Sequence, residues 1–139
     1  MMKKSLCGIC LIILLTGNVW AQEVNTVKVD VLAKTSTSWD GRDLPNYSKG
    51  QPEITILRIK IPPKTQLPLH EHPVINAGVL LKGELTVVTK NKETLHLKVG
   101  DSIVEVVGKW HYGKNDGNEL AEIIVFYAGV KETPITIKK

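Results

Sequence analysis

The sequence predicts an all-β domain, a small antiparallel sandwich or barrel. Apolar residues alternate with polar ones along several short segments, and no sustained 3.6-residue apolar period follows Glu23. Turn-forming pairs such as Asp-Gly, Pro-Pro and Lys-Gly separate these segments. Short strands at this spacing, with turns between them, are typical of an antiparallel sandwich or barrel.

Residues 1–21 have the three-part pattern of a secretory signal peptide. Two lysines precede an apolar stretch from about Leu6 to Leu15, and Ala21 is a small residue at the cleavage point. The apolar stretch is short for a membrane span, and no second one follows it. We therefore expect cleavage after Ala21, a mature chain that begins near Gln22, and a periplasmic or secreted protein without stable membrane insertion. A retained N-terminal anchor is the alternative.

Cleavage would change the composition of the chain. Cys7 and Cys10 would be lost, so the mature chain could form no disulfide and offer no thiolate ligand. The formal net charge of +4 would fall to about +2, because Lys3 and Lys4 are removed as well. A surplus that small, scattered among acidic residues, gives no basic stripe for nucleic acid. The remaining chain has the size of a single domain with one core.

Residues 22–52 are expected to form an N-terminal strand and a polar arm that pack on the barrel. Valines alternate with polar residues in "VNTVKVDVLA", which predicts a half-buried strand. The polar segment Lys34–Gln51 is the longest break in the pattern and should wrap the barrel mouth or an edge. Trp39 lies within it. This tryptophan could line a ligand pocket at the barrel mouth or serve only for structural packing.

Residues 53–139 are expected to form the barrel itself. "EITILRIKIP" and "TLHLKVG" alternate and read as half-buried strands. "LAEIIVFYAGV" is the most apolar segment after the leader and should lie in the core. "TPITIKK" follows as a short edge strand or tail, with a proline at its start where a missing donor is tolerated.

Three of the four histidines are candidates for a functional site. His70 and His72 are two residues apart, so on a strand both imidazoles point to the same face. A third, His111, lies in the downstream segment "GDSIVEVVGKWHYGKN". His96 shares its alternating face with a threonine and a lysine, so we expect it to be exposed and leave it out of the site.

The first histidine segment resembles the first motif of the cupin superfamily. That motif places a glutamate shortly after H-x-H and a glycine six residues beyond the glutamate. Here His70 and His72 match the histidines and Gly83 matches the glycine, while Asn76 stands where the family has its carboxylate.

The second segment resembles the second cupin motif, G-x5-P-x-G-x2-H-x3-N. Gly100, Gly108, His111 and Asn115 occupy their places, with Val106 where proline is usual. The resemblance covers residues 53–127. It implies a single cupin barrel, a double-stranded β-helix of jelly-roll type, with a metal site inside it.

The resemblance implies that His70, His72 and His111 hold a divalent transition metal, which could be Fe, Mn, Ni, Cu or Zn. Such an ion takes several neutral imidazoles, and a barrel lets distant segments meet at its mouth. In most metal-binding cupins the carboxylate is a fourth ligand. With Asn76 in its place, the site has either three histidines alone or three histidines and an amide oxygen.

Glu105 interrupts the apolar run "SIVEVV" and has two readings. If it points into the barrel, it is a candidate catalytic residue, as a general base, or a substitute ligand. If it points outward, it is a solvated strand residue, and this is the orientation that we expect. Trp110 and Tyr112 flank His111 and by alternation should face the opposite side. There they would serve core or rim packing or line a substrate pocket.

The resemblance implies a metal-binding protein that acts on or binds a small molecule at the three-histidine site, and the leader implies that this protein is exported. If it is an enzyme, it is metal-dependent and dioxygenase- or isomerase-like. The alternative is a non-catalytic small-molecule-binding or structural cupin without a required metal, because the fold alone does not choose among activities. Small cupins often pair through edge strands and the N-terminal arm, so a homodimer is one option.

Overall fold

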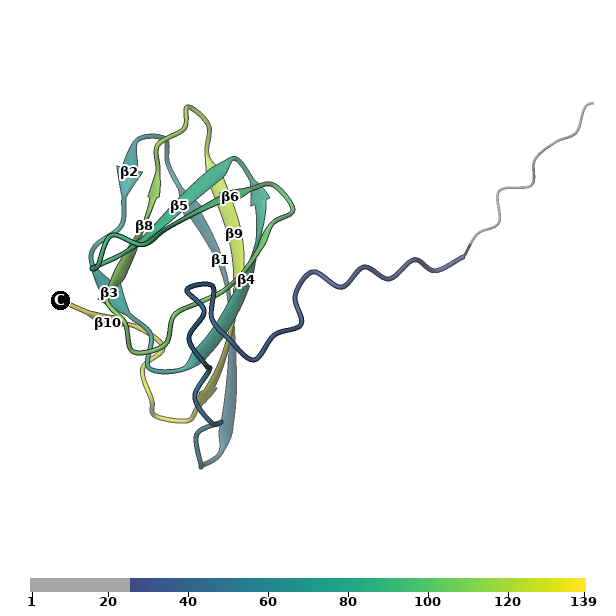
Figure 1. Ribbon diagram of the computed structural model, residues 1–139, viewed down its shortest axis with the longest axis vertical. Coiled ribbons are helices and arrows are strands. Elements are labelled where there is room, and N and C mark those ends of the chain that lie inside the picture. The colour runs from purple at the N-terminus through teal and green to yellow at the C-terminus, as the bar shows by residue number, and fades with distance from the viewer. Residues whose placement is uncertain (1–25) are drawn as a thin grey trace, which may run out of the picture.

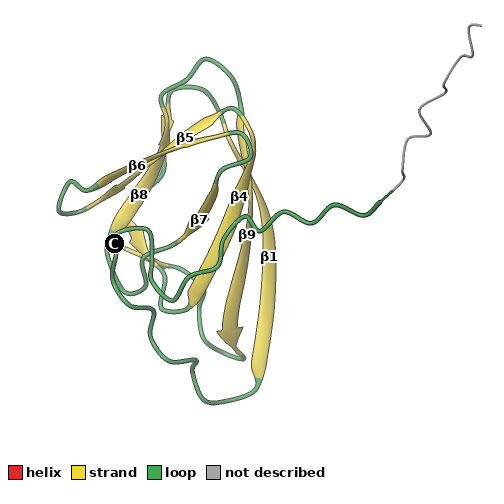
Figure 2. Ribbon diagram, turned by 45° about the vertical axis from the view of Figure 1, so that its right-hand side comes forward, coloured by secondary structure: helices red, strands yellow, loops and turns green. Residues whose placement is uncertain are grey.

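The computed structural model describes residues 26–139, which form ten β-strands and no helix (Figures 1 and 2). The strands are β1 (Pro52–Ile61), β2 (Thr65–Gln66), β3 (His70–Glu71), β4 (Ile75–Lys82), β5 (Glu84–Thr89), β6 (Thr94–Lys98), β7 (Ser102–Val104), β8 (His111–Asn115), β9 (Ala121–Val130) and β10 (Ile137–Lys138). Residues 26–139 therefore contain no helix that could cross a membrane. The predicted leader, residues 1–21, lies outside the described residues.

The strands form two antiparallel sheets that enclose a barrel (Figure 1). One sheet has the order β1-β9-β4-β7, and the other has the order β10-β3-β8-β5-β6, with β2 also paired to β8. The predicted all-β fold is confirmed.

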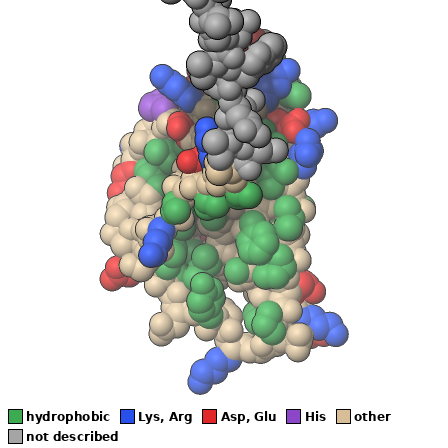
Figure 3. Space-filling view, turned by 90° about the vertical axis from the view of Figure 1, so that its right-hand side faces the viewer, with side chains coloured by type: hydrophobic (Ala, Val, Ile, Leu, Met, Phe, Trp, Pro, Cys, Tyr) green, Lys and Arg blue, Asp and Glu red, His purple; other side chains and the backbone are tan. Residues whose placement is uncertain are grey.

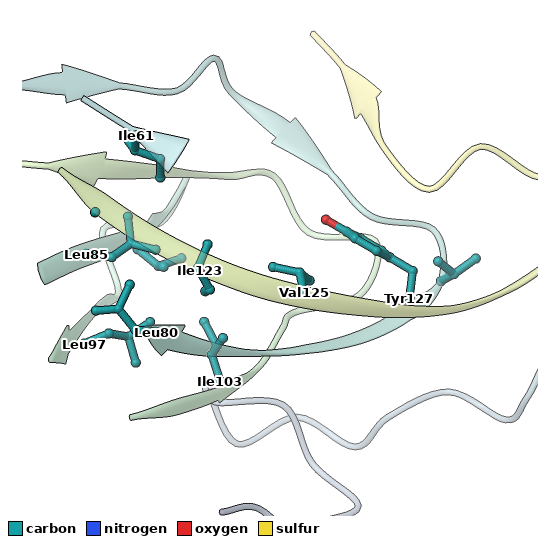
Figure 4. Close-up of a cluster of buried hydrophobic side chains, with 11 residues drawn as sticks. Ile61, Leu80, Leu85, Leu97, Ile103, Ile123, Val125 and Tyr127 are labelled. Atoms are coloured by element: carbon teal, nitrogen blue, oxygen red, sulfur yellow. The ribbon is translucent and has the colours of Figure 1, made fainter. Parts of the chain in front are cut away.

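The core lies between the inner faces of the two sheets (Figure 4). Its buried members are Ile61, Val74, Leu80, Leu85, Val87, Leu97, Ile103, Ala121, Ile123, Val125 and Tyr127. Four of them alternate along β9, which lies between β1 and β4. The expectation that this apolar strand lies in the core is confirmed.

One glycine and one asparagine of the motifs, Gly83 and Asn115, stabilise turns of the barrel. Gly83, between β4 and β5, has a φ of 70°, and a Cβ there would lie 2.6 Å from the Leu120 carbonyl oxygen, so only glycine fits. Asn115 is fully buried at the end of β8. Its Nδ2 donates to the carbonyl oxygens of Ile61 and Glu119, at 3.0 and 2.7 Å, and its Oδ1 accepts from the backbone of Gly117.

The strand predicted at residues 24–33 is wrong for the part that the structure describes. From residue 26 to residue 35 the chain forms no strand, and it runs away from the barrel (Figures 1 and 2). Val27, Val29 and Val31 are 92%, 82% and 73% exposed. Alternation marks a segment that suits a half-buried strand, but a strand also needs a neighbour for its backbone, and this barrel provides none to the segment.

The polar segment Lys34–Gln51 returns to the barrel. The backbone N–H of Trp39 donates to the carbonyl of Val104 at 2.9 Å, which joins the segment to the end of β7. A short bridge between Thr37 and Asp43 closes a turn within it. The segment thus brings Trp39 against the core.

Candidate metal centre

The three motif histidines converge inside the barrel. His70 on β3 pairs directly with His111 on β8, and His72 follows β3 in a bridge to Val107. The ring centroids are 4.5 to 5.1 Å apart. One nitrogen of each ring lies within 4.8 Å of the other two, and both His72 and His111 are buried.

Each imidazole is held through its Nδ1 atom by a backbone carbonyl. His70 bonds the carbonyl of Pro68 at 2.7 Å, His72 that of Ile135 at 2.8 Å, and His111 that of Lys109 at 2.8 Å. A carbonyl oxygen only accepts, so each Nδ1 carries the proton and each Nε2 keeps its lone pair. Metal-ligating histidines are commonly fixed through the other ring nitrogen in this way.

Burial keeps the three rings neutral. It lowers the pKa of His70 and of His111, and it lowers the pKa of His72 to about 4. Around neutral pH all three imidazoles are therefore neutral, with one proton each, on Nδ1. A cation can be bound by such rings without first displacing a proton.

Glu105 points into the barrel, and the expected outward orientation is wrong. Its Oε2 lies 3.6 Å from Nε2 of His111, and its side chain is only 12% exposed. The residue follows the buried Ile103 by two positions, so alternation carries it inward. Burial raises the pKa of Glu105 to about 7. Burying a charged carboxylate is costly, but this group meets polar neighbours and is protonated in part at neutral pH.

Trp39 joins the site from outside the motifs. It packs against the core, and its indole N–H is buried without a hydrogen-bond partner. This N–H also faces the carboxyl of Glu105, whose pKa it lowers against the larger effect of burial. The two roles considered for Trp39, packing and lining the site, are thus compatible.

Asn76 lies on the inner side of β4 and is 1% exposed. Its backbone carbonyl accepts the N–H of Glu105 at 3.0 Å, so the two residues are neighbours across the sheet. Its Nδ2 reaches the Val74 carbonyl at 3.5 Å, while its Oδ1 is buried with no hydrogen-bond partner.

Four buried polar side-chain atoms among residues 26–139 lack a hydrogen-bond partner, and all belong to this region. They are Nε1 of Trp39, Oδ1 of Asn76, Oε2 of Glu105 and Nε2 of His111. Unpaired buried polar atoms are costly and rare, so their concentration beside three oriented imidazoles needs an explanation. An ion and a small polar ligand bound there would satisfy them.

Other residues considered from the sequence lie elsewhere. His96 is exposed on β6, where its Nδ1 lies 3.0 Å from the hydroxyl of Thr86. Tyr112 is half-buried on the outer side of β8, since His111 and Gly113 form the buried side. Trp110 precedes β8 and is half-buried as well.

Sequence reasoning missed three contributions to the site. The C-terminal tail supplies the Ile135 carbonyl and the Thr136 hydroxyl, 2.8 and 3.2 Å from Nδ1 of His72. The ring of Tyr127 lies 5.3 Å from that of His72. No local sequence pattern predicts such contacts, because they depend on where the tail and β9 lie in the folded chain.

The third missed contribution is a buried ion-pair network centred on Lys109. Its ammonium binds Asp40 at 2.8 Å and also Glu93, while its carbonyl holds His111. Burial opposes ionisation of Asp40, yet hydrogen bonds from Lys109, Ser38 and the Arg42 backbone outweigh it and lower the pKa of Asp40 to about 2. The network ties the Trp39 segment to the strand that carries His111.

Comparison with known proteins gives a family and a fold. A family model described as a cupin domain matches residues 57–127. No curated protein matches the sequence. Solved structures with a similar fold include an oxalate oxidase in complex with the substrate analogue glycolate, with 22% identity, a TM-score of 0.53, and coverage of 61% of this chain and 45% of that one.

Two further structures show the same likeness. The DMSP lyase DddQ from Ruegeria pomeroyi has 20% identity, a TM-score of 0.54, and coverage of 62% of this chain and 43% of that one. A cupin-like protein from Thermotoga maritima has 13% identity, a TM-score of 0.53, and coverage of 62% and 64%. The chain spans less than half the length of the first two proteins, and identities this low show the fold alone.

Proposed function

Because the chain belongs to the cupin family, with the family's domain at residues 57–127, we propose that it is an exported metal-binding cupin. It holds a divalent transition-metal ion on His70, His72 and His111 and binds a small oxygen-containing molecule beside that ion. The observation that carries this proposal is that every Nδ1 is fixed on a backbone carbonyl, which leaves each Nε2 lone pair free in a cluster where one nitrogen of each ring lies within 4.8 Å of the others.

The donor set favours a transition metal. Imidazole nitrogens suit Fe, Mn, Ni, Cu and Zn, whereas Ca²⁺ and Mg²⁺ take mainly oxygen ligands. Three protein ligands leave at least one coordination position for water or a small molecule. The Asn76 amide oxygen is neutral and would be a weak fourth ligand at most.

Two residues around the histidines are suited to handle a bound ligand. Glu105, with a pKa of about 7, can accept or donate a proton near neutral pH, and it lies beside His111. The indole N–H of Trp39 can donate a hydrogen bond to a ligand oxygen. When bound, the ion supplies Lewis-acid polarisation of an oxygen atom.

A non-catalytic binding module is the second candidate, and Asn76 favours it. The family's usual carboxylate is missing at this position. Among residues 26–139, Glu105 is the one acidic side chain with an oxygen within 4.0 Å of a ring nitrogen of these histidines, and that nitrogen belongs to His111. The two candidates share the metal and the ligand site. They differ in the effect of Glu105→Gln, which keeps the shape of the side chain. In an enzyme this substitution should abolish catalysis, whereas in a binding module it should only alter ligand affinity.

Elemental analysis tests whether the protein binds a metal. The protein is produced with its own leader, so that it is exported, and is purified without chelators or a nickel column. We expect about one equivalent of a transition metal, also in His96→Ala. A double variant, His70→Ala with His72→Ala, should contain almost none. A metal-free wild type, or equal metal in the double variant, would overturn the proposal.

N-terminal sequencing of the secreted protein tests export. The leader pattern predicts a start near Gln22. A chain that begins at Met1 and stays in the membrane fraction would show that the leader is an anchor.

A further inference from the structure

The three histidines of the metal centre differ in where the carbonyl that holds each ring comes from. The carbonyls that hold His70 and His111 belong to residues two positions earlier in the same segment. The carbonyl that holds His72 belongs to Ile135, 63 positions away in the sequence. The two histidine segments therefore fix two of the rings by themselves. The third ring is fixed by the tail, residues 131–139.

The tail lies against the sheet that carries His70 and His111 (Figure 1). Its strand β10 pairs with β3 through two residues, with Ile137 opposite Glu71 and Lys138 opposite His70. The β1-β9-β4-β7 sheet forms the other side of the barrel, where Figure 3 shows hydrophobic side chains gathered on the outer surface. The tail is not a strand of that sheet, so its docking acts on the side of the barrel that holds the metal centre.

The contacts that hold the tail are short and largely exposed. Each of residues 131–139 is half-buried or exposed, and β10 lies at the edge of its sheet. The side chain of Ile135 packs against the core, and the backbone N–H of Lys139 donates to the carbonyl of Leu69 at 3.2 Å. Segments with little buried surface open locally more readily than core strands. Docking of the tail is therefore an equilibrium that its contact with His72 can shift.

On the basis of the metal site proposed above, we propose that docking of the tail and binding of the ion are coupled. The Ile135 carbonyl is a positioning group that prepares His72 for the ion, and the bound ion in turn holds the tail in place. A carbonyl oxygen only accepts, so it keeps the proton of His72 on Nδ1 and leaves the Nε2 lone pair free. Without the tail, the ring can also carry its proton on Nε2, and in that form Nε2 cannot bind an ion.

The coupling acts in both directions. An ion on Nε2 withdraws electron density from the His72 ring, which makes the Nδ1–H group a stronger donor to the Ile135 carbonyl. By linkage, the factor by which the docked tail raises metal affinity equals the factor by which the ion favours the docked tail. Loss of a supporting partner typically weakens metal binding about 10 to 100-fold, and we expect both factors to lie in this range.

One residue of the tail opposes the ion. Lys138 pairs with His70, so the docked tail brings a positive charge toward the metal centre. Lys138 is exposed, and water and salt screen its charge. Removing the tail removes this repulsion together with the Ile135 carbonyl. The loss of affinity on removal is therefore a lower limit for the effect of the carbonyl.

Zn²⁺ affinity, measured against a competing chelator, tests the effect of the tail on the ion. A chain shortened to end at Thr133 lacks the Ile135 carbonyl and should bind Zn²⁺ about 10 to 100-fold more weakly than the full chain. Ile135→Ser keeps the carbonyl but removes the side chain that anchors the tail, so it should also weaken binding. Ile137→Ser is the matched control, because this side chain is 39% exposed on β10. It should leave the affinity nearly unchanged.

Hydrogen exchange of the tail amides, followed by mass spectrometry with and without Zn²⁺, tests the effect of the ion on the tail. Where exchange reports the opening equilibrium, Zn²⁺ should slow exchange of residues 131–139 by the same factor by which shortening the chain lowers the affinity. The turn between β8 and β9 lies at the other end of β8 from His111 and is the internal control (Figure 1). Its exchange should not change by this factor.

The metal-free protein offers a readout that needs no ion. Nitrogen NMR of the His72 ring should show the proton on Nδ1 in the full chain and a mixture of the two tautomers in the chain that ends at Thr133. Circular dichroism verifies that the shortened chain is folded. If it does not fold, Ile135→Ser and the exchange measurement on the full chain decide the question.

The outcomes separate the coupling from the metal site itself. A full chain that binds neither Zn²⁺ nor any other transition-metal ion would overturn the proposed metal site and the coupling with it. A full chain that binds Zn²⁺ no more tightly than Ile135→Ser and the folded shortened chain would overturn the coupling alone. Equal exchange of the tail with and without bound Zn²⁺, or an Nδ1 proton retained by His72 in the folded shortened chain, would do the same.

Discussion

Asn76 is the residue at which this chain departs from the usual cupin metal site. It lies inside the barrel beside Glu105, and its Oδ1 has no hydrogen-bond partner. A neutral amide there leaves the charge of the bound ion less compensated than a carboxylate would. The residue thus bears on both the affinity for the ion and the acidity of any bound water.

Replacing Asn76 by glutamate should tighten binding of a divalent ion, because the new side chain adds an anionic oxygen donor next to three imidazoles. The same change should destabilise the metal-free protein, since it buries a further carboxyl. Metal titration and thermal unfolding with and without the ion measure both effects. Asn76→Gln, which lengthens the side chain without adding charge, is the control. Unchanged affinity in Asn76→Glu would mean that this side chain does not face the ion.

Among the elements, the strands could be predicted better than the contacts that loops and tails make with the site. Alternation predicted β6 and β9, because their inner residues line the core. It also predicted β1, but there Ile54 and Ile56 are exposed and only Ile59 and Ile61 reach the core. It failed at residues 26–33, which have a strand-like pattern but no neighbouring strand in the barrel. It could not foresee the carbonyl of Ile135 on His72, because that contact depends on the path of the C-terminal tail.

The network around Lys109 joins three elements: the segment that carries Trp39, the hairpin of β5 and β6, and the start of β8. Lys109→Met should lower the free energy of unfolding by on the order of 3 kcal/mol, because it leaves the buried carboxylate of Asp40 with only the exposed Arg42, 3.5 Å away, as a cation. Lys114→Met removes an ion pair with the exposed Asp116 and should lower the free energy of unfolding by less, because water screens an exposed pair. Denaturant unfolding at neutral pH compares the two variants. Equal losses would show that the network adds no more than a surface pair.

The same network sets a dependence on pH. Asp40 has a pKa of about 2 in the folded chain, below the ordinary aspartate pKa of 3.8, so its contribution to stability is present above about pH 4 and is lost as the pH falls toward 2. The stability difference between wild type and Lys109→Met should therefore shrink over that interval. Protonation of the histidines acts on both proteins alike and cancels in the difference. A gap that stays constant down to pH 2 would contradict the assignment.

In the whole molecule, the barrel brings segments that are distant in the sequence next to one another. The two histidine motifs are separated by about 40 residues, yet β3 and β8 are neighbours and His70 pairs with His111. The two motifs in the sequence predicted that the three histidines converge. They did not reveal the inward orientation of Glu105, nor the closure of the site by Trp39 from outside the matched domain. The orientation of Glu105 depends on how a polar interior changes the cost of burial, and the position of Trp39 depends on the path of the segment that carries it.

Metal affinity measured against a competing chelator tests whether His70, His72 and His111 form a metal centre. His111→Ala removes one of three donors and should weaken binding by at least the 10 to 100-fold that is typical of losing a supporting contact. His96→Ala removes an exposed histidine and should leave the affinity unchanged. Circular dichroism verifies that both variants are folded. Equal affinities in two folded variants would contradict the account.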